Sequence, residues 1–151
     1  MDLHFPKLNT NEKELVLKAP LLVCILIAGA DGKIDSKELS EAIGISRDRN
    51  WVKANLNTYY DEVAQDFEDK IKILIQAYPY DGKQRNEIII RELGTLASLW
   101  DKLGQEFSSE LYESLKYVAQ RIAQSSGGFL RKISPEEASL IDLPMIDPPS
   151  K

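Results

Sequence analysis

Apolar residues recur at intervals of three and four over most of the chain, which is the period of a helix with one buried face. The clearest case is the stretch 59–78, where charged residues fall off the apolar stripe. That stripe consists of Val63, Phe67, Ile71, Leu74, Ile75 and Tyr78. The pattern predicts a single amphipathic helix over this stretch.

Two more stretches repeat this pattern, 84–103 and 109–122. Glycine, proline and serine punctuate the chain at 78–82, at Gly104 and at 125–128, which predicts turns between the helices. The alternating apolar and polar pattern of a β-strand appears nowhere between them. The apolar positions of the two stretches are Ile89, Leu93, Leu96, Trp100 and Leu103, followed by Leu111, Leu115, Val118 and Ile122.

The run 19–30 is almost wholly apolar and predicts a helix buried on every side. Pro20 lies at its start, so we expect a break or kink there, with 11–18 as a lead-in and 21–29 as the buried helix. Twelve residues are too few to cross a bilayer, which needs about 20. The residues before the run mix acidic and basic side chains, unlike the positive start of an export signal.

Helix starts are marked by a capping residue three positions before a glutamate. Prolines near the carboxyl end cannot continue a helix, so we expect the segment 143–151 to fray. The fold class predicted is all-α: a single-domain bundle of about six to eight helices, with a lead-in at 1–10, a helical domain at 11–142 and a tail at 143–151. The capping pairs are Asn11 with Glu14, Asp35 with Glu38, and Ser134 with Glu137, the last having Pro135 at the first helical position.

Composition narrows the function only a little. The 151 residues carry a net charge of −5, which disfavours non-specific adhesion to nucleic acid or anionic lipid. Cys24 is the only cysteine and lies in the most apolar run, so we expect a packed, unreactive thiol and a reducing, cytoplasmic location. A chain of this length can bury a core without disulfides or metals.

The turn after the apolar run carries three carboxylates around a glycine and corresponds to the second half of an EF-hand loop. The first half is missing, since the first and third loop positions would be Ile27 and Gly29, which have no side-chain oxygen. Half a cation site is therefore present. The matching residues are Asp31, Gly32, Lys33, Ile34, Asp35 and Glu38 at loop positions 5, 6, 7, 8, 9 and 12.

Two interpretations of this turn stay open. Helix punctuation explains most of it, with Gly32 ending one helix and Asp35 and Glu38 starting the next. Clustered carboxylates, however, repel one another unless a cation or a basic side chain relieves them. A second acidic turn contains Asp101 and Glu110, and if the two turns meet, they pool their carboxylates. The hypothesis is a weakly bound divalent cation at Asp31, Asp35, Glu38, Asp101 and Glu110.

The segment 22–38, an apolar helix running into Ala30-Asp31-Gly32-Lys33-Ile34 and Glu38, resembles the signature of the TerB-like, tellurite-resistance-associated proteins. The segments 123–130 and 133–137 resemble the closing part of some bacterial members. The resemblance implies two pseudo-repeated helical halves, a role in metal or stress response, and no established catalytic chemistry. The second turn departs from the signature, with Trp100-Asp101-Lys102 in place of Ala-Asp-Gly.

Other chemistry finds little support in the sequence. The single histidine, His4, lies near the end of the chain, and there is no nucleophile elbow or phosphate-binding loop. A carboxylate-based enzyme using Asp31 with Asp101 or Glu110 stays as an alternative. A second alternative is a helix-turn-helix DNA reader at 39–47, which the acidic charge and the polar residues after it disfavour.

The function expected from the sequence is therefore a non-catalytic helical module. It binds a divalent cation weakly or docks a protein partner through the acidic corner, with no nucleic-acid partner and no transmembrane segment.

Overall fold

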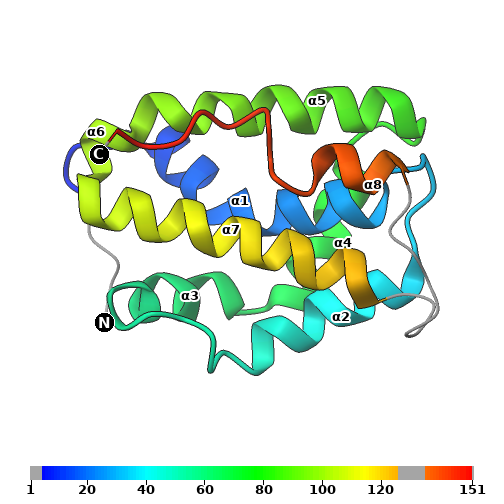
Figure 1. The fold of residues 1–151 in the computed structure, drawn as a ribbon, viewed down its shortest axis with the longest axis horizontal. Helices are drawn as coiled ribbons and strands as arrows, with labels where there is room; N and C mark the ends of the chain where they lie inside the picture. The colour runs from blue at the N-terminus through cyan, green and yellow to red at the C-terminus, as the bar shows by residue number, and fades with distance from the viewer. Residues whose placement is uncertain (1–4, 126–134, 151) are drawn as a thin grey trace.

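Helix α1, Thr10–Ala28, is the central element of the computed structural model, which describes residues 5–125 and 135–150 (Figure 1). Its residues 19–28 are all buried, because α1 packs on α7, α2, α5 and α3. The apolar run of the sequence is thus the core helix. No helix in the described residues is long and apolar enough to span a membrane.

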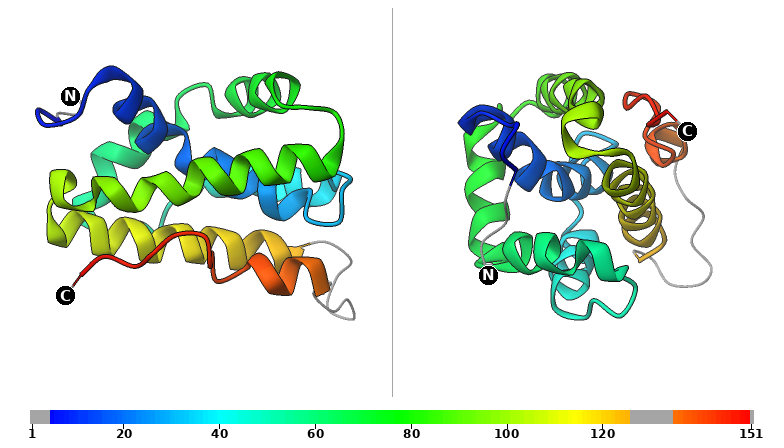
Figure 2. Two further views of the ribbon diagram at one scale, coloured as in Figure 1. Left: turned by 90° about the horizontal axis from the view of Figure 1, so that it is seen from above. Right: turned by 90° about the vertical axis from the view of Figure 1, so that its left-hand side faces the viewer.

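Helices α2, α3, α4, α5 and α7 pack against α1, and the described residues contain no β-strand. The all-α prediction is therefore confirmed, and α1 to α8 agree with the expected number of helices. Helix α4 crosses the back of the bundle, at the left of the right-hand view in Figure 2. The elements after α1 are α2 (Ser36–Arg47), η1 (Ala54–Leu56), α3 (Asn57–Ala64), α4 (Phe67–Ala77), α5 (Gly82–Gly94), η2 (Thr95–Leu99), α6 (Trp100–Leu103), α7 (Gln105–Ser125) and α8 (Pro135–Leu140).

The break expected at Pro20 does not occur, because α1 continues through it. Proline has no N–H, so the carbonyl of Val16 loses its usual helical partner. The buried hydroxyl of Tyr59 donates to that carbonyl at 2.6 Å. A side chain from α3 thus replaces the missing backbone bond, which the local sequence around Pro20 does not reveal.

The single helix predicted over 59–78 is wrong. The structure has two helices, α3 and α4, separated at Gln65 and Asp66. Asp66 has a φ of 54° in the left-handed region, which ends the first helix and redirects the chain. The apolar stripe stays in register across the break, since Val63, Phe67 and Ile71 are all buried. Periodicity alone therefore concealed the change of direction.

The later helices follow the predictions more closely. The stretch 84–103 is helical throughout, although its middle part, η2, is a 3-10 helix between α5 and α6. Gly104 separates α6 from α7 with a φ of 91°. The predicted stretch 109–122 lies within α7.

The capping residues predicted from the sequence are correct for some helices and wrong for others. Helix α1 begins slightly earlier than predicted, because the capping box is formed by Asn9 and Glu12 and not by Asn11 and Glu14. Asp35 caps α2 as predicted. Pro135 is the first residue of α8, whereas its predicted cap, Ser134, lies outside the described residues.

The predicted fraying of the tail is wrong for the part that the structure describes. After α8 the chain runs back between α5 and α7 towards α6 (Figure 1). Leu143 and Ile146 are buried, and the indole N–H of Trp100 donates to the carbonyl of Asp147 at 2.8 Å. Prolines exclude a helix here, but two apolar side chains anchor the segment to the core.

Candidate functional site

The turn between α1 and α2 is held by its own carboxylates. The Asp31 carboxylate accepts a hydrogen bond from the backbone N–H of Lys33 at 3.2 Å. Asp35 accepts from the N–H groups of Lys37 and Glu38, at 2.8 and 3.0 Å, and so caps α2. Gly32 has a φ of 103°, which favours glycine. Helix α1 ends at its C-cap Gly29 and not at Gly32 as predicted, so Gly32 shapes the turn itself, while Asp35 starts α2 as predicted.

Arg85 of α5 joins this turn to the rest of the molecule. The residue is 4% exposed, and its Nη2 donates to the carbonyls of Gly29 and Gly32, at 3.1 and 3.3 Å. The side-chain amide of Asn86 donates to the same Gly29 carbonyl at 3.0 Å. Because the end of a helix carries partial negative charge, a cation here stabilises the last turn of α1. The guanidinium also interacts electrostatically with Asp31, one of the three carboxylates of the first turn.

Burial lowers the pKa of the Arg85 guanidinium, while the carboxylates of Asp31 and Asp81 oppose that change. These two acids come from two different turns, the first between α1 and α2 and the second between α4 and α5. The two turns therefore share one buried cation, which couples them electrostatically.

The backbones of the two turns also touch. A Cβ on Gly82 would overlap the carbonyl oxygen of Gly32, so only glycine fits at the start of α5. A Cβ on Gly29 would overlap Nη2 of Arg85. Glycines at both positions let the guanidinium and the second turn approach the end of α1.

A cleft lies between the two turns, and we call it the corner cleft. Both turns are at the end of the bundle on the right of Figure 1. Tyr80 lies at its edge and is fully exposed, whereas Ile34 and Ile75 are half-buried in its walls. The cleft encloses about 600 Å³. Its lining consists of Gly32, Lys33, Ile34, Ile75, Pro79, Tyr80, Asp81, Gly82 and Arg85.

The corner is not as acidic as the first turn suggests. Basic side chains alternate with acidic ones in both turns and along the first turn of each following helix. The acidic residues are Asp31, Asp35, Glu38 and Asp81, and the basic residues are Lys33, Lys37, Lys83 and Arg85. Equal numbers give no excess of negative charge at this corner.

The structure does not bring the five predicted site residues together. Asp101 is exposed on α6, whose next residue, Lys102, forms a salt bridge of 2.9 Å with Glu12 in the first turn of α1. Asp31 follows the other end of α1, and a helix of 19 residues is about 28 Å long. The two acidic turns thus lie at opposite ends of the bundle, as Figures 1 and 2 show. The shared acidic corner is not formed.

Glu110 lies towards the same end of the molecule as Asp101, and its partner comes from the segment before α3. The amide of Asn55 donates to the carboxylates of Glu106 and Glu110, at 2.9 and 3.4 Å. Glu38 is 2% exposed at the start of α2. Within residues 5–125 and 135–150, no group of three or more histidine, cysteine, aspartate or glutamate side chains is placed to hold a metal ion. Cation binding by Asp31, Asp35 and Glu38 stays a prediction.

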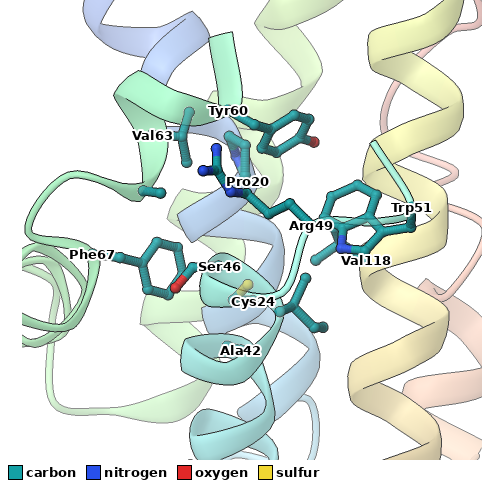
Figure 3. A pocket seen from close by; sticks show the side chains of 12 residues that line it. Pro20, Cys24, Ala42, Ser46, Arg49, Trp51, Tyr60, Val63, Phe67 and Val118 are labelled. Atoms are coloured by element: carbon teal, nitrogen blue, oxygen red, sulfur yellow. The ribbon is translucent and has the colours of Figure 1, made fainter. Parts of the chain in front are cut away.

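Cys24 lines a small apolar cavity between α1, α2, α3 and α7 (Figure 3). The stem of Arg49 crosses this cavity, and its guanidinium forms a salt bridge of 2.6 Å with Asp61. The cavity has room for little more than one water molecule. Burial raises the pKa of the Cys24 thiol, so the nucleophilic thiolate does not form. The expectation of a packed thiol is confirmed.

The structure also places the residues of the two alternative functions, a helix-turn-helix DNA reader and a carboxylate-based enzyme. Helix α2 continues through Gly44 to Arg47, so the glycine turn of the predicted helix-turn-helix does not form. The enzyme alternative paired Asp31 with Asp101 or Glu110, which lie too far apart to act together. His4 lies outside the described residues.

Sequence reasoning missed Arg85, Asn86 and the second turn of the corner. The sequence did contain one indication of the second turn, because Asp81-Gly82-Lys83 has the same three residues as Asp31-Gly32-Lys33. The acidic turn at Asp101, which the sequence-based hypothesis paired with the first turn, differs from it in the spacing and order of its acidic residues and glycine. No signal identified Arg85, since its contacts with the first turn span more than 50 residues of sequence.

Comparison with known proteins gives no further guide to this site. No family model, curated protein or solved structure matches the chain.

Proposed function

We propose that the chain is a non-catalytic helical binding module of the TerB-like kind, which docks a segment of a partner protein in the corner cleft. The observation that carries the proposal is the exposed ring of Tyr80 above a cleft with half-buried isoleucines and a buried guanidinium. Tyrosine is a frequent anchor of protein interfaces, because its large ring is rigid and its hydroxyl is polar. A role in stress response rests on the family resemblance.

The corner is rigid enough to serve as a docking surface. Arg85 and Asn86 fix the first turn from α5, and the close backbone contact of Gly32 with Gly82 fixes the second turn against the first. A surface that is already in its binding conformation loses little entropy when a partner binds.

Docking is favoured over cation binding by the charges at the corner. Arg85 already places a positive charge against the Gly29 and Gly32 carbonyls, and that charge repels a second cation at this turn. Asp31 and Asp35 accept hydrogen bonds from backbone N–H groups. A cation would therefore compete with a guanidinium and with the turn's own hydrogen bonds.

The test begins with a photo-reactive amino acid at position 80, and at the exposed position Gln120 of α7 as a matched control. We expect a specific cross-linked protein from position 80 and none from position 120. That protein is then purified and its affinity measured for the wild type and for Tyr80→Ser and Tyr117→Ser, the last a second exposed tyrosine on α7.

Loss of an interface tyrosine costs about 2 kcal/mol or more when it is an anchor, so Tyr80→Ser should weaken binding at least roughly ten-fold. Tyr117→Ser should leave the affinity unchanged. Equal affinities for all three proteins would refute docking at the corner cleft.

The cation version is tested separately by thermal melting with calcium, manganese or zinc. A ligand at a hundred times its dissociation constant adds about 2.7 kcal/mol of stability. A rise in melting temperature that Asp31→Asn abolishes would replace the docking proposal with a cation site.

A further inference from the structure

Resting on the proposed function, we infer that the corner cleft recognises a carboxylate next to an aliphatic side chain: the carboxy terminus of a partner chain that ends in leucine, isoleucine or valine. The inference depends on spare hydrogen-bond donors, on the charges around them and on the apolar walls of the cleft.

Arg85 has donors to spare. Both of its hydrogen bonds in the described residues come from Nη2, and Nε is buried without an acceptor there. An arginine has five N–H donors in a planar fork, which suits an oxyanion. Because Arg85 is 4% exposed and lines the cleft, an acceptor placed there meets a desolvated cation. Charge-assisted hydrogen bonds are strongest under such conditions.

The nearby charges favour an anion with a single charge. Two basic side chains, Lys33 and Arg85, and one acidic side chain, Asp81, line the cleft, which leaves an excess of one positive charge. The Asp81 carboxylate already accepts a hydrogen bond from the backbone N–H of Gln84. One carboxylate balances the excess, whereas a dianionic phosphate would exceed it.

The walls accept an aliphatic side chain beside the carboxylate. Ile34 and Ile75 are half-buried, and Pro79 and Tyr80 complete an apolar rim. A volume of about 600 Å³ is within the range of small-ligand sites. An extended peptide end of two or three residues is therefore the size of occupant that the cleft admits.

The experiment follows the side-chain Nε–H resonance of Arg85 by nitrogen-15 NMR in the whole chain. The probes are acetylated pentapeptides ending in Leu, Ile or Val, each made with a free carboxylate and as the terminal amide. We expect the free acids to shift the Arg85 Nε–H signal and the backbone signals of Gly32 and Gly82. The amides should bind at least ten-fold more weakly.

Lys33→Gln is the variant for this test, because Lys33 is exposed and its loss should not unfold the chain. This variant should bind the free-acid peptides several-fold more weakly and should bind the amides with unchanged affinity. Lys13→Gln, at an exposed position near the start of α1 and so at the other end of that helix, is the matched control and should change neither. Arg85→Lys adds a check only if its melting temperature stays close to that of the wild type.

The outcomes separate this inference from the proposed function. Equal binding of acids and amides at the cleft overturns carboxylate recognition and leaves docking intact. Binding of free isovalerate as tightly as the peptides replaces the peptide end with a small organic acid. No shift with any probe overturns the inference, while docking is still judged by the Tyr80 experiment.

Discussion

At the scale of single residues, the hydroxyl of Tyr59 shows how a core helix tolerates a proline. It donates to the Val16 carbonyl, which Pro20 leaves without a helical partner. Tyr59→Phe removes the hydroxyl and leaves a buried carbonyl unsatisfied. We expect the free energy of unfolding to fall by about 1–3 kcal/mol, measured by urea denaturation.

A double-mutant cycle separates this effect from lost packing. Pro20→Ala restores an N–H that can donate to the Val16 carbonyl. The cost of Tyr59→Phe should therefore be smaller in the Pro20→Ala background than in the wild type, by about 0.5 kcal/mol or more. The same cost in both backgrounds would mean that the hydroxyl does not substitute for the backbone bond.

Gly29 allows the Arg85 guanidinium to reach the end of α1. A Cβ there would overlap Nη2 of Arg85 and lie 3.1 Å from the Ile25 carbonyl. Because Arg85 is held by two carbonyls, it cannot move away freely. Gly29→Ala should destabilise the chain by about 1–3 kcal/mol in the same urea experiment.

Gly44 provides the matched control for this substitution. It lies within α2, and a Cβ there meets nothing within 4 Å. Alanine favours a helix over glycine by about 1 kcal/mol, so Gly44→Ala should stabilise the chain. If Gly29→Ala stabilised the chain as much as Gly44→Ala, the close contact at Gly29 would not matter.

At the scale of elements, the sequence predicted which segments are helical better than where the helices turn. The apolar stripe through Val63, Phe67 and Ile71 correctly identified a buried face. It gave no sign of the break at Asp66, because the same stripe continues on both sides. Aspartate enters the left-handed region more readily than most residues, but it is also common on exposed helix faces, so its identity alone was ambiguous.

The break at Asp66 predicts an unusual order of stability. Asp66 is exposed and its side chain does not cap α4. At a φ of 54°, glycine avoids a steric cost of about 1–2 kcal/mol that alanine bears. Asp66→Gly should therefore be more stable than Asp66→Ala in thermal melting.

Gln76 is an exposed residue within α4 and serves as the comparison. There the order should be the ordinary one, with alanine more stable than glycine by about 1 kcal/mol. The same order at both positions would argue against a left-handed break at Asp66.

At the scale of the whole molecule, the candidate site was only half predictable. The turn at Asp31 has a local signature, so the sequence identified it. Arg85 and Gly82 complete the site from α5, and their contacts with Gly32 depend on how the helices pack. Asp101 was wrongly joined to the first turn, because the sequence does not say which turns share an end of the bundle. The sequence motif therefore indicated the turn but not the residues that pack against it.

The tail shows the same dependence on packing and gives the last prediction. Ile146 is 2% exposed in a segment without helix, beside a carbonyl that accepts from the Trp100 indole. Ile146→Ala should lower the free energy of unfolding by about 2–5 kcal/mol, measured by urea denaturation with tryptophan fluorescence. Asp142→Ala, at an exposed position shortly before it, should stay within about 0.5 kcal/mol of the wild type. A frayed tail predicts no difference between the two variants, because neither side chain would then be buried.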